Sequence, residues 1–162
     1  MEPIRFDSAR DFFEAARDAA SDAMRISRQL AAIEGSALSL GGSTFEPRVR
    51  SSSSADRVST AAALLVDVGG ELARRQEEDY RLIDAACRVL YGTDDKAGLW
   101  ALVGWRADAL FHHYLGLRTW AEVGEMLGYG EQHVWRQAMA ALDSADAWGC
   151  VATIAGQGFA EE

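Results

Sequence analysis

The sequence predicts an all-α fold, and three observations support this class. The 162 residues include only two prolines, Pro3 and Pro47, so little in the chain interrupts a helix. Alanine is abundant and runs of β-branched residues are absent, which favours helix over strand. Apolar side chains recur at alternating intervals of three and four residues over long stretches, as they do along one face of a helix.

The first predicted helix runs from about residue 8 to residue 37. Ser8 and Asp11 form a capping pattern at its start, because both side chains can accept bonds from free N–H groups of the first turn. Its apolar seam repeats every seven residues, with the intermediate positions also filled: Ala9, Phe12, Ala16, Ala19, Ala23, Ile26, Leu30, Ile33 and Ala37. We expect the polar side chains outside this seam to lie in water, namely Arg10, Arg17, Asp18, Asp22, Arg25 and Arg28.

A second long helix is predicted from about residue 54 to residue 91, and residues 1–92 together predict an antiparallel helical hairpin. Ser53 and Asp56 repeat the capping pattern, and the apolar spacing continues with polar interruptions at Gln76 and Asp79. The connection, residues 38–53, is rich in serine and glycine and predicts a loop. The pair Gly69 and Gly70 predicts either a close helix contact or a bend, since each glycine weakens a helix.

A helix-turn-helix module is predicted over residues 97–148, followed by a flexible tail over 149–162. Thr119 and Glu122 form a capping pair for a short helix, and Gly124 is expected to let another helix cross closely at that point. Gly128 suits a sharp turn, which Tyr129 is expected to fill. The next helix turns Val134, Ala138, Ala141 and Leu142 inward, and its outward face is expected among Glu131, Gln132, His133, Trp135, Arg136 and Gln137. Trp100, Trp105 and Trp120 are expected in the core.

The segment TWAEVGEMLGYGEQHVWRQAMAAL resembles the fourth region of bacterial sigma factors. It is more similar still to phage and prophage transcriptional regulators of the ArpU and RinA type, which place a long helical hairpin before a sigma-like helix-turn-helix. The matching positions are Tyr129, Val134, Arg136, Ala141 and Leu142, together with the stretch YLGLRTW at 114–120. The resemblance implies a regulator that binds double-stranded promoter or operator DNA in the cytoplasm of a bacterial host.

On this hypothesis, Gln132, Arg136 and His133 reach base edges in the major groove, with Glu131 on the same helix. The exposed Trp135 contacts either a base methyl group or a protein. Arg118 and Arg106 position the phosphate backbone. We expect the hairpin to supply homodimerisation or a contact to host RNA polymerase.

The charge keeps a second function open. The net charge is −9, which argues against a protein that coats nucleic acid or acidic membrane without specificity. The alternative is an acidic protein-binding module of a mobile element that inhibits or redirects a host complex in transcription or defence. A packaging or structural adaptor built on the same hairpin is a third interpretation.

The remaining chemistry-bearing residues predict neither an enzyme nor a metal protein. His112, His113 and His133 have no ligand partners at zinc spacing, and the two cysteines, Cys87 and Cys150, lie far apart outside any CxxC pattern. No nucleophile stands beside a recognisable base, so we expect no catalytic residue and no cofactor. The first residues show no basic segment followed by an apolar one, and no apolar run approaches the length of a membrane span, so we expect a cytoplasmic protein.

Overall fold

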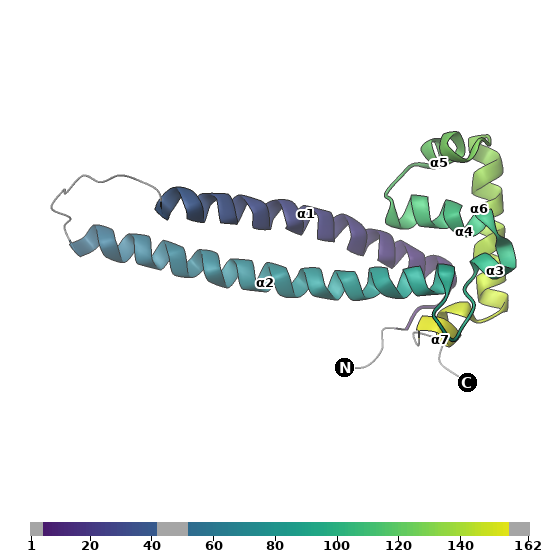
Figure 1. The fold of residues 1–162 in the computed structure, drawn as a ribbon, viewed down its shortest axis with the longest axis horizontal. Coiled ribbons are helices and arrows are strands. Elements are labelled where there is room, and N and C mark those ends of the chain that lie inside the picture. The colour runs from purple at the N-terminus through teal and green to yellow at the C-terminus, as the bar shows by residue number, and fades with distance from the viewer. Residues whose placement is uncertain (1–4, 42–51, 156–162) are drawn as a thin grey trace. The chain divides into compact units, whose positions relative to one another are not determined.

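The computed structural model describes residues 5–41 and 52–155, and most of these residues are helical, as predicted (Figure 1). The described part contains seven α-helices and one π-helical segment. They are α1 (Ala9–Gly41), α2 (Ser52–Tyr91), α3 (Trp100–Val103), α4 (Trp105–Leu110), η1 (Phe111–Leu115), α5 (Trp120–Leu127), α6 (Glu131–Ala147) and α7 (Cys150–Ala155). None of the described helices is long and apolar enough to cross a membrane.

Helices α1 and α2 form the predicted antiparallel pair, but both are longer than the sequence pattern indicated (Figure 1). The predicted loop 38–53 is therefore wrong at both of its ends, since 38–41 and 52–53 are helical. Nothing in residues 38–40 stops a helix before the glycine at 41. The middle of that loop, 42–51, and the side chains of Ala37, Ser53 and Asp56 lie outside the described residues.

The chain divides into two compact units. We call residues 22–78 the hairpin unit and residues 1–21 with 79–162 the core unit. This division does not coincide with the domain boundary predicted near residue 92. The physical reason is that Phe12, Phe13 and Leu90 are fully buried in the same apolar cluster as Leu110 and Leu142.

The start of α1 is fastened within the core unit. The Ser8 hydroxyl accepts a bond from the Asp11 N–H at 3.1 Å, which confirms the predicted cap. The Ala9 N–H donates to the Asp146 carboxylate of α6 at 2.7 Å. Two first-turn N–H groups therefore have acceptors, one of them from a distant helix.

The predicted flexible tail is wrong for residues 150–155, which form α7. Cys150 and Val151 are buried, and the Lys96 ammonium donates to the Thr153 carbonyl at 2.7 Å. Cys150 and Val151 extend the hydrophobic core beyond Gly149, and their burial holds α7 against the core unit. The rest of the tail, 156–162, lies outside the described residues.

In the hairpin unit, the predicted seam is buried at Ala23 and Ile26 and half-buried at Leu30 and Ile33. The last two side chains help line an apolar cavity of about 350 Å³ between α1 and α2, together with Ala62, Leu65, Val66 and Gly69. A Cβ atom added at Gly69 or Gly70 would meet nothing within 4 Å. Of the two alternatives predicted for these glycines, the close helix contact is therefore excluded.

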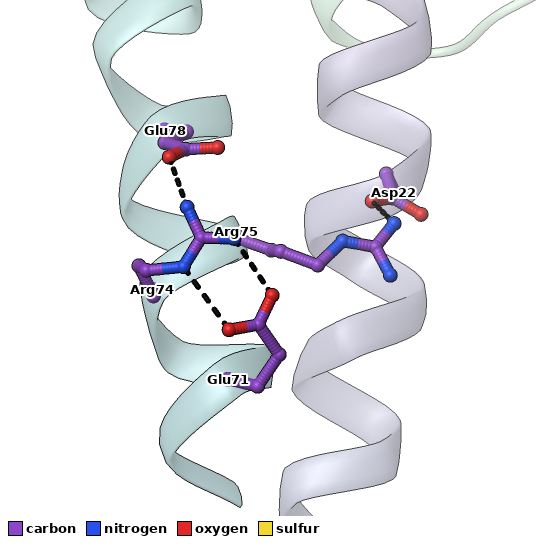
Figure 2. A network of polar contacts seen from close by, with 5 residues as sticks. All are labelled: Asp22, Glu71, Arg74, Arg75 and Glu78. Atoms are coloured by element: carbon purple, nitrogen blue, oxygen red, sulfur yellow. Dashed lines mark hydrogen bonds and ion pairs between the residues drawn. The ribbon is translucent and has the colours of Figure 1, made fainter. Parts of the chain in front are cut away.

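Polar residues join the two helices of this unit (Figure 2). Arg75 reaches from α2 to the Asp22 carboxylate of α1 at 3.0 Å, while its neighbour Arg74 pairs with Glu71 and Glu78 on α2 itself. Asp22, expected in water, is thus partly buried, and hydrogen bonds from Arg25 and Arg75 lower the pKa of its carboxyl.

The predicted polar interruption of α2 also makes contacts across the pair. The Gln76 amide donates to the Ser27 hydroxyl at 2.6 Å and to the Ala23 carbonyl at 3.3 Å. An apolar side chain at 76 would leave these acceptors without that donor.

Candidate nucleic-acid interface

The site is built on the turn that joins α5 to α6. The α5 cap is a complete capping box: the Glu122 N–H donates to the Thr119 hydroxyl at 3.3 Å, and the Thr119 N–H donates to the Glu122 carboxylate at 2.7 Å. Gly128 ends the helix in the left-handed conformation, with φ 78° and ψ 28°. The cap and the turn glycine are both where the sequence predicts them.

Gly124 permits the close approach that the sequence predicts, but the neighbour is the turn itself. A Cβ at this position would stand 2.6 Å from the Tyr129 carbonyl oxygen, closer than real Cβ atoms come. The Tyr129 N–H donates to the Gly124 carbonyl at 2.9 Å. The turn therefore folds tightly back on α5, and this fixes the direction in which α6 leaves it.

Tyr129 does not bury itself in the turn, since 44% of it is exposed. Its ring stacks on Trp105 of α4 with centroids 4.6 Å apart, and the His133 ring lies 5.3 Å from Tyr129 and 6.2 Å from Trp105. This cluster of three rings links the turn to α4. Trp105 and Trp120 are half-buried against the cluster of Ala109, Val123 and Val134. Trp100, expected in the core, is 52% exposed, which corrects that prediction.

Helix α6 presents the predicted faces. Its inward positions Val134, Ala138, Ala141 and Leu142 are all buried. Its N-terminal half leaves five of the predicted site residues exposed: Glu131, Gln132, His133, Trp135 and Arg136. Trp135 is 47% exposed, a large apolar area to leave in water on a helix that also carries charge.

Arg118 lies in the short segment that connects the π-helical segment η1 to α5. Its N–H donates to the His112 carbonyl at 3.1 Å, and its own carbonyl accepts from His113 Nδ1 at 2.7 Å. Leu117, just before it, has φ 58°, a left-handed conformation that costs a non-glycine residue about 1–2 kcal/mol. The side chain of Arg118 is exposed and makes no ion pair with any described residue.

Arg106, the other predicted phosphate contact, is placed differently. It lies on α4 and is only partly exposed. Its Nε atom is buried and has no hydrogen-bond partner in the described part of the chain. Arg118 and Arg136 are exposed, so Arg106 is the least accessible of the three arginines in residues 97–148.

Two arginines of α1 that the sequence assigned to water lie beside this interface, where Arg10 is exposed, as expected, and Arg17 is not. Arg17 of α1 is partly buried and donates to the His113 carbonyl, and Arg10 donates to the Met139 sulfur of α6 at 2.9 Å. Helical periodicity could exclude both from the seam, but it could not show that η1 and α6 lie next to them. Both side chains line a polar cavity of about 260 Å³ that also includes Trp120 and Trp135.

His113 of η1 has a pKa well below that of an ordinary histidine. Burial, with a smaller contribution from the Arg17 guanidinium, lowers the pKa of His113 to about 4. The imidazole is therefore neutral at physiological pH, and its Nδ1 carries the proton because the Arg118 carbonyl can only accept. Within 5–41 and 52–155, no three His, Cys, Asp or Glu side chains gather as a metal site.

Comparison of the chain with protein-family models, with curated proteins and with solved structures finds no match.

Proposed function

We propose that this protein is a phage or prophage transcription regulator whose α5 and α6 form a sigma-like helix-turn-helix that reads DNA. The single observation that carries the proposal is the exposed N-terminal half of α6 directly after a three-residue turn with a left-handed glycine. Two helices joined by such a turn are the arrangement in which the second helix enters the major groove.

The exposed side chains of α6 suit base recognition. Arg136 can bond in bidentate fashion to guanine, Gln132 to adenine, and Glu131 can accept from the amino group of cytosine. The helix positions of Gln132 and Arg136 differ by four, so both lie on one face, opposite the buried Val134 and Ala138. His133 and Trp135 flank that face.

Contacts to the DNA phosphate backbone are assigned mainly to Arg118. It precedes the N-terminus of α5, the helix that crosses the phosphate backbone in this arrangement. His112 and His113 hold its main chain by hydrogen bonds, so the backbone from which the Arg118 side chain would reach a phosphate is fixed in place. Arg106 contributes less because it is partly covered.

The acidic balance favours a second candidate, a module that binds a host protein through its surface. Residues 97–150 contain three arginines, no lysine and six acidic residues, and the chain as a whole carries −9. An acidic surface with an exposed Trp135 suits a basic protein partner such as a nucleic-acid-handling complex.

One experiment separates the two functions. The full chain is used to select duplexes from a random-sequence DNA pool, and in parallel to capture proteins from bacterial lysate with and without nuclease. Enrichment of a defined sequence, lost in Gln132→Ala combined with Arg136→Ala, supports the regulator. No enrichment, together with nuclease-resistant capture of a protein that Trp135→Ala abolishes, replaces it with the protein-binding module.

A further inference from the structure

A polar cavity in the core unit opens beside the exposed face of α6. It has a volume of about 260 Å³ and brings together α1, η1, α5 and α6. Its charged lining consists of Arg10, Glu14 and Arg17, all from α1. Two indoles, Trp120 and Trp135, form part of its wall.

The cavity carries a net positive charge that its arginines supply. Arg10 and Arg17 are seven residues apart, which places them on one face of α1 about 10 Å apart along its axis. Glu14 lies between them and offsets one of the two charges, and the neutral His113 adds none.

Both guanidinium groups keep donors for a ligand. Arg10 gives one N–H to a thioether, which is a weak acceptor, and Arg17 gives one to the His113 carbonyl. A guanidinium has five N–H donors, so most remain unused. Their planar geometry matches the oxygens of a phosphate.

The position of the cavity relates it to DNA. Trp135 and Met139 line it and lie on one flank of α6, next to the face that holds Gln132 and Arg136. A helix about 10–12 Å across fills a major groove about 12 Å wide, so its flanks face the phosphates of both strands. A cationic cavity on such a flank would therefore lie next to the phosphate backbone of one DNA strand.

We propose that this cavity receives a backbone phosphate of the DNA, bound by Arg10 and Arg17 and flanked by the indoles of Trp120 and Trp135. The inference rests on the proposed function. Arg10 and Arg17 add two cations to a helix-turn-helix that has few of its own, and α1 becomes part of the DNA-binding surface.

The test measures how DNA affinity depends on salt. A labelled duplex selected by the full chain, and a scrambled duplex, are titrated between about 50 and 200 mM salt, where each ionic contact contributes about −0.9 to the slope of log affinity against log salt. Because a single phosphate is proposed, Arg10→Gln combined with Arg17→Gln should flatten the slope by about 0.9 in total per bound copy. Each single glutamine variant should flatten it by no more than that, and all three variants should weaken both duplexes alike. Arg28→Gln, an exposed arginine of the same helix but of the hairpin unit, should leave the slope unchanged.

A charge-conserving variant separates a phosphate contact from damage to the fold. Arg17→Lys should keep the wild-type slope, because the slope counts charges neutralised, whereas Arg17→Gln should not. In a duplex with one neutral methylphosphonate at the contacted position, the penalty of Arg10→Gln should disappear.

The outcomes distinguish this inference from the function on which it rests. If the wild type binds neither duplex, the proposed function and this inference both fail. If the wild type binds and both glutamine variants keep its slope, the cavity inference is wrong and the regulator stands. If those variants keep the slope but lose quenching of tryptophan fluorescence by inorganic phosphate, the cavity binds a free anion instead. If the glutamine variants keep the slope but no longer capture a host protein, the cavity is a protein contact.

Discussion

His113 lies face to face with Trp120, with ring centroids 3.7 Å apart and planes inclined by 14°. The same imidazole donates from Nδ1 to the Arg118 carbonyl at 2.7 Å. One side chain of η1 therefore holds both the backbone that presents Arg118 and the first residue of α5. Because protonation would charge a partly buried ring, this arrangement should depend on pH.

We predict that acidification destabilises the core unit through His113. Burial lowers the folded-state pKa of His113 to about 4 from an ordinary value near 6.5. Between these values the unfolded chain binds the proton more readily than the folded chain, so the free energy of unfolding falls as the pH drops from about 6.5 to about 4. Chemical denaturation at a series of pH values measures this decrease.

The matched variant for that experiment is His113→Asn, which removes the titrating group and keeps a short side chain with an N–H donor. Its absolute stability should be lower, since the stack on Trp120 is lost. Its pH dependence over the same interval should be shallower than that of the wild type. Equal pH dependence in the two proteins would show that carboxyl groups alone account for the effect.

We predict that Gly69→Ala and Gly70→Ala each stabilise the hairpin unit by up to about 1 kcal/mol. Alanine is the better helix former by about that amount, and a Cβ at either position meets nothing within 4 Å. Thermal and chemical denaturation of the full chain give the change in free energy.

The contrasting substitution is Gly124→Ala, at another helical glycine. Its Cβ would stand 2.6 Å from the backbone oxygen of Tyr129, so the turn between α5 and α6 would have to move. This variant should be destabilised and should lose DNA binding. A stabilised Gly124→Ala would mean that the turn is not held against α5 as described.

We predict different effects of two arginines on DNA binding. Arg136→Ala should cost about 1–3 kcal/mol at the selected sequence and relax the choice of one base pair, because a bidentate base contact is lost. Arg118→Ala should weaken all sequences by a similar factor, because phosphates carry no sequence information. Binding of each variant to a panel of single-base-pair substitutions shows which pattern applies, and identical patterns would contradict the assigned roles.

We predict that the chain forms a homodimer through the hairpin unit. Large apolar side chains remain exposed on its helices, with Leu38 77%, Leu64 62% and Val66 73% exposed. A second copy is the simplest partner that covers such a surface in a symmetric way. Light scattering at micromolar concentration should report twice the monomer mass of 17.6 kDa.

The double variant Leu64→Glu with Val66→Glu should reduce that mass to the monomer value. Ala121→Glu with Ala147→Glu adds the same charge at exposed positions of the core unit and should leave the dimer intact. A wild type that is monomeric throughout would contradict the predicted dimer.

Features that depend on neighbours within a few residues could be predicted from the sequence alone. The caps at Ser8 and Thr119 and the turn at Gly128 involve groups at most four positions apart. The same holds for the buried and exposed faces of α6, because helical periodicity alone decides which side chains share a face. The all-α class and the exposed site residues on α6 follow from these local rules.

The tertiary structure alone decided what covers each face. Arg17 and His113 are 96 positions apart, so no local pattern could place a guanidinium of the first helix beside η1 and turn a solvent arginine into part of a cavity. The same reason explains why Arg106 is partly covered, why Trp100 is exposed and why α7 joins the core instead of fraying. Helical periodicity shows which residues share a face of a helix. The burial and the charge at a site depend on which distant segment packs against that face, and only the tertiary structure determines this segment.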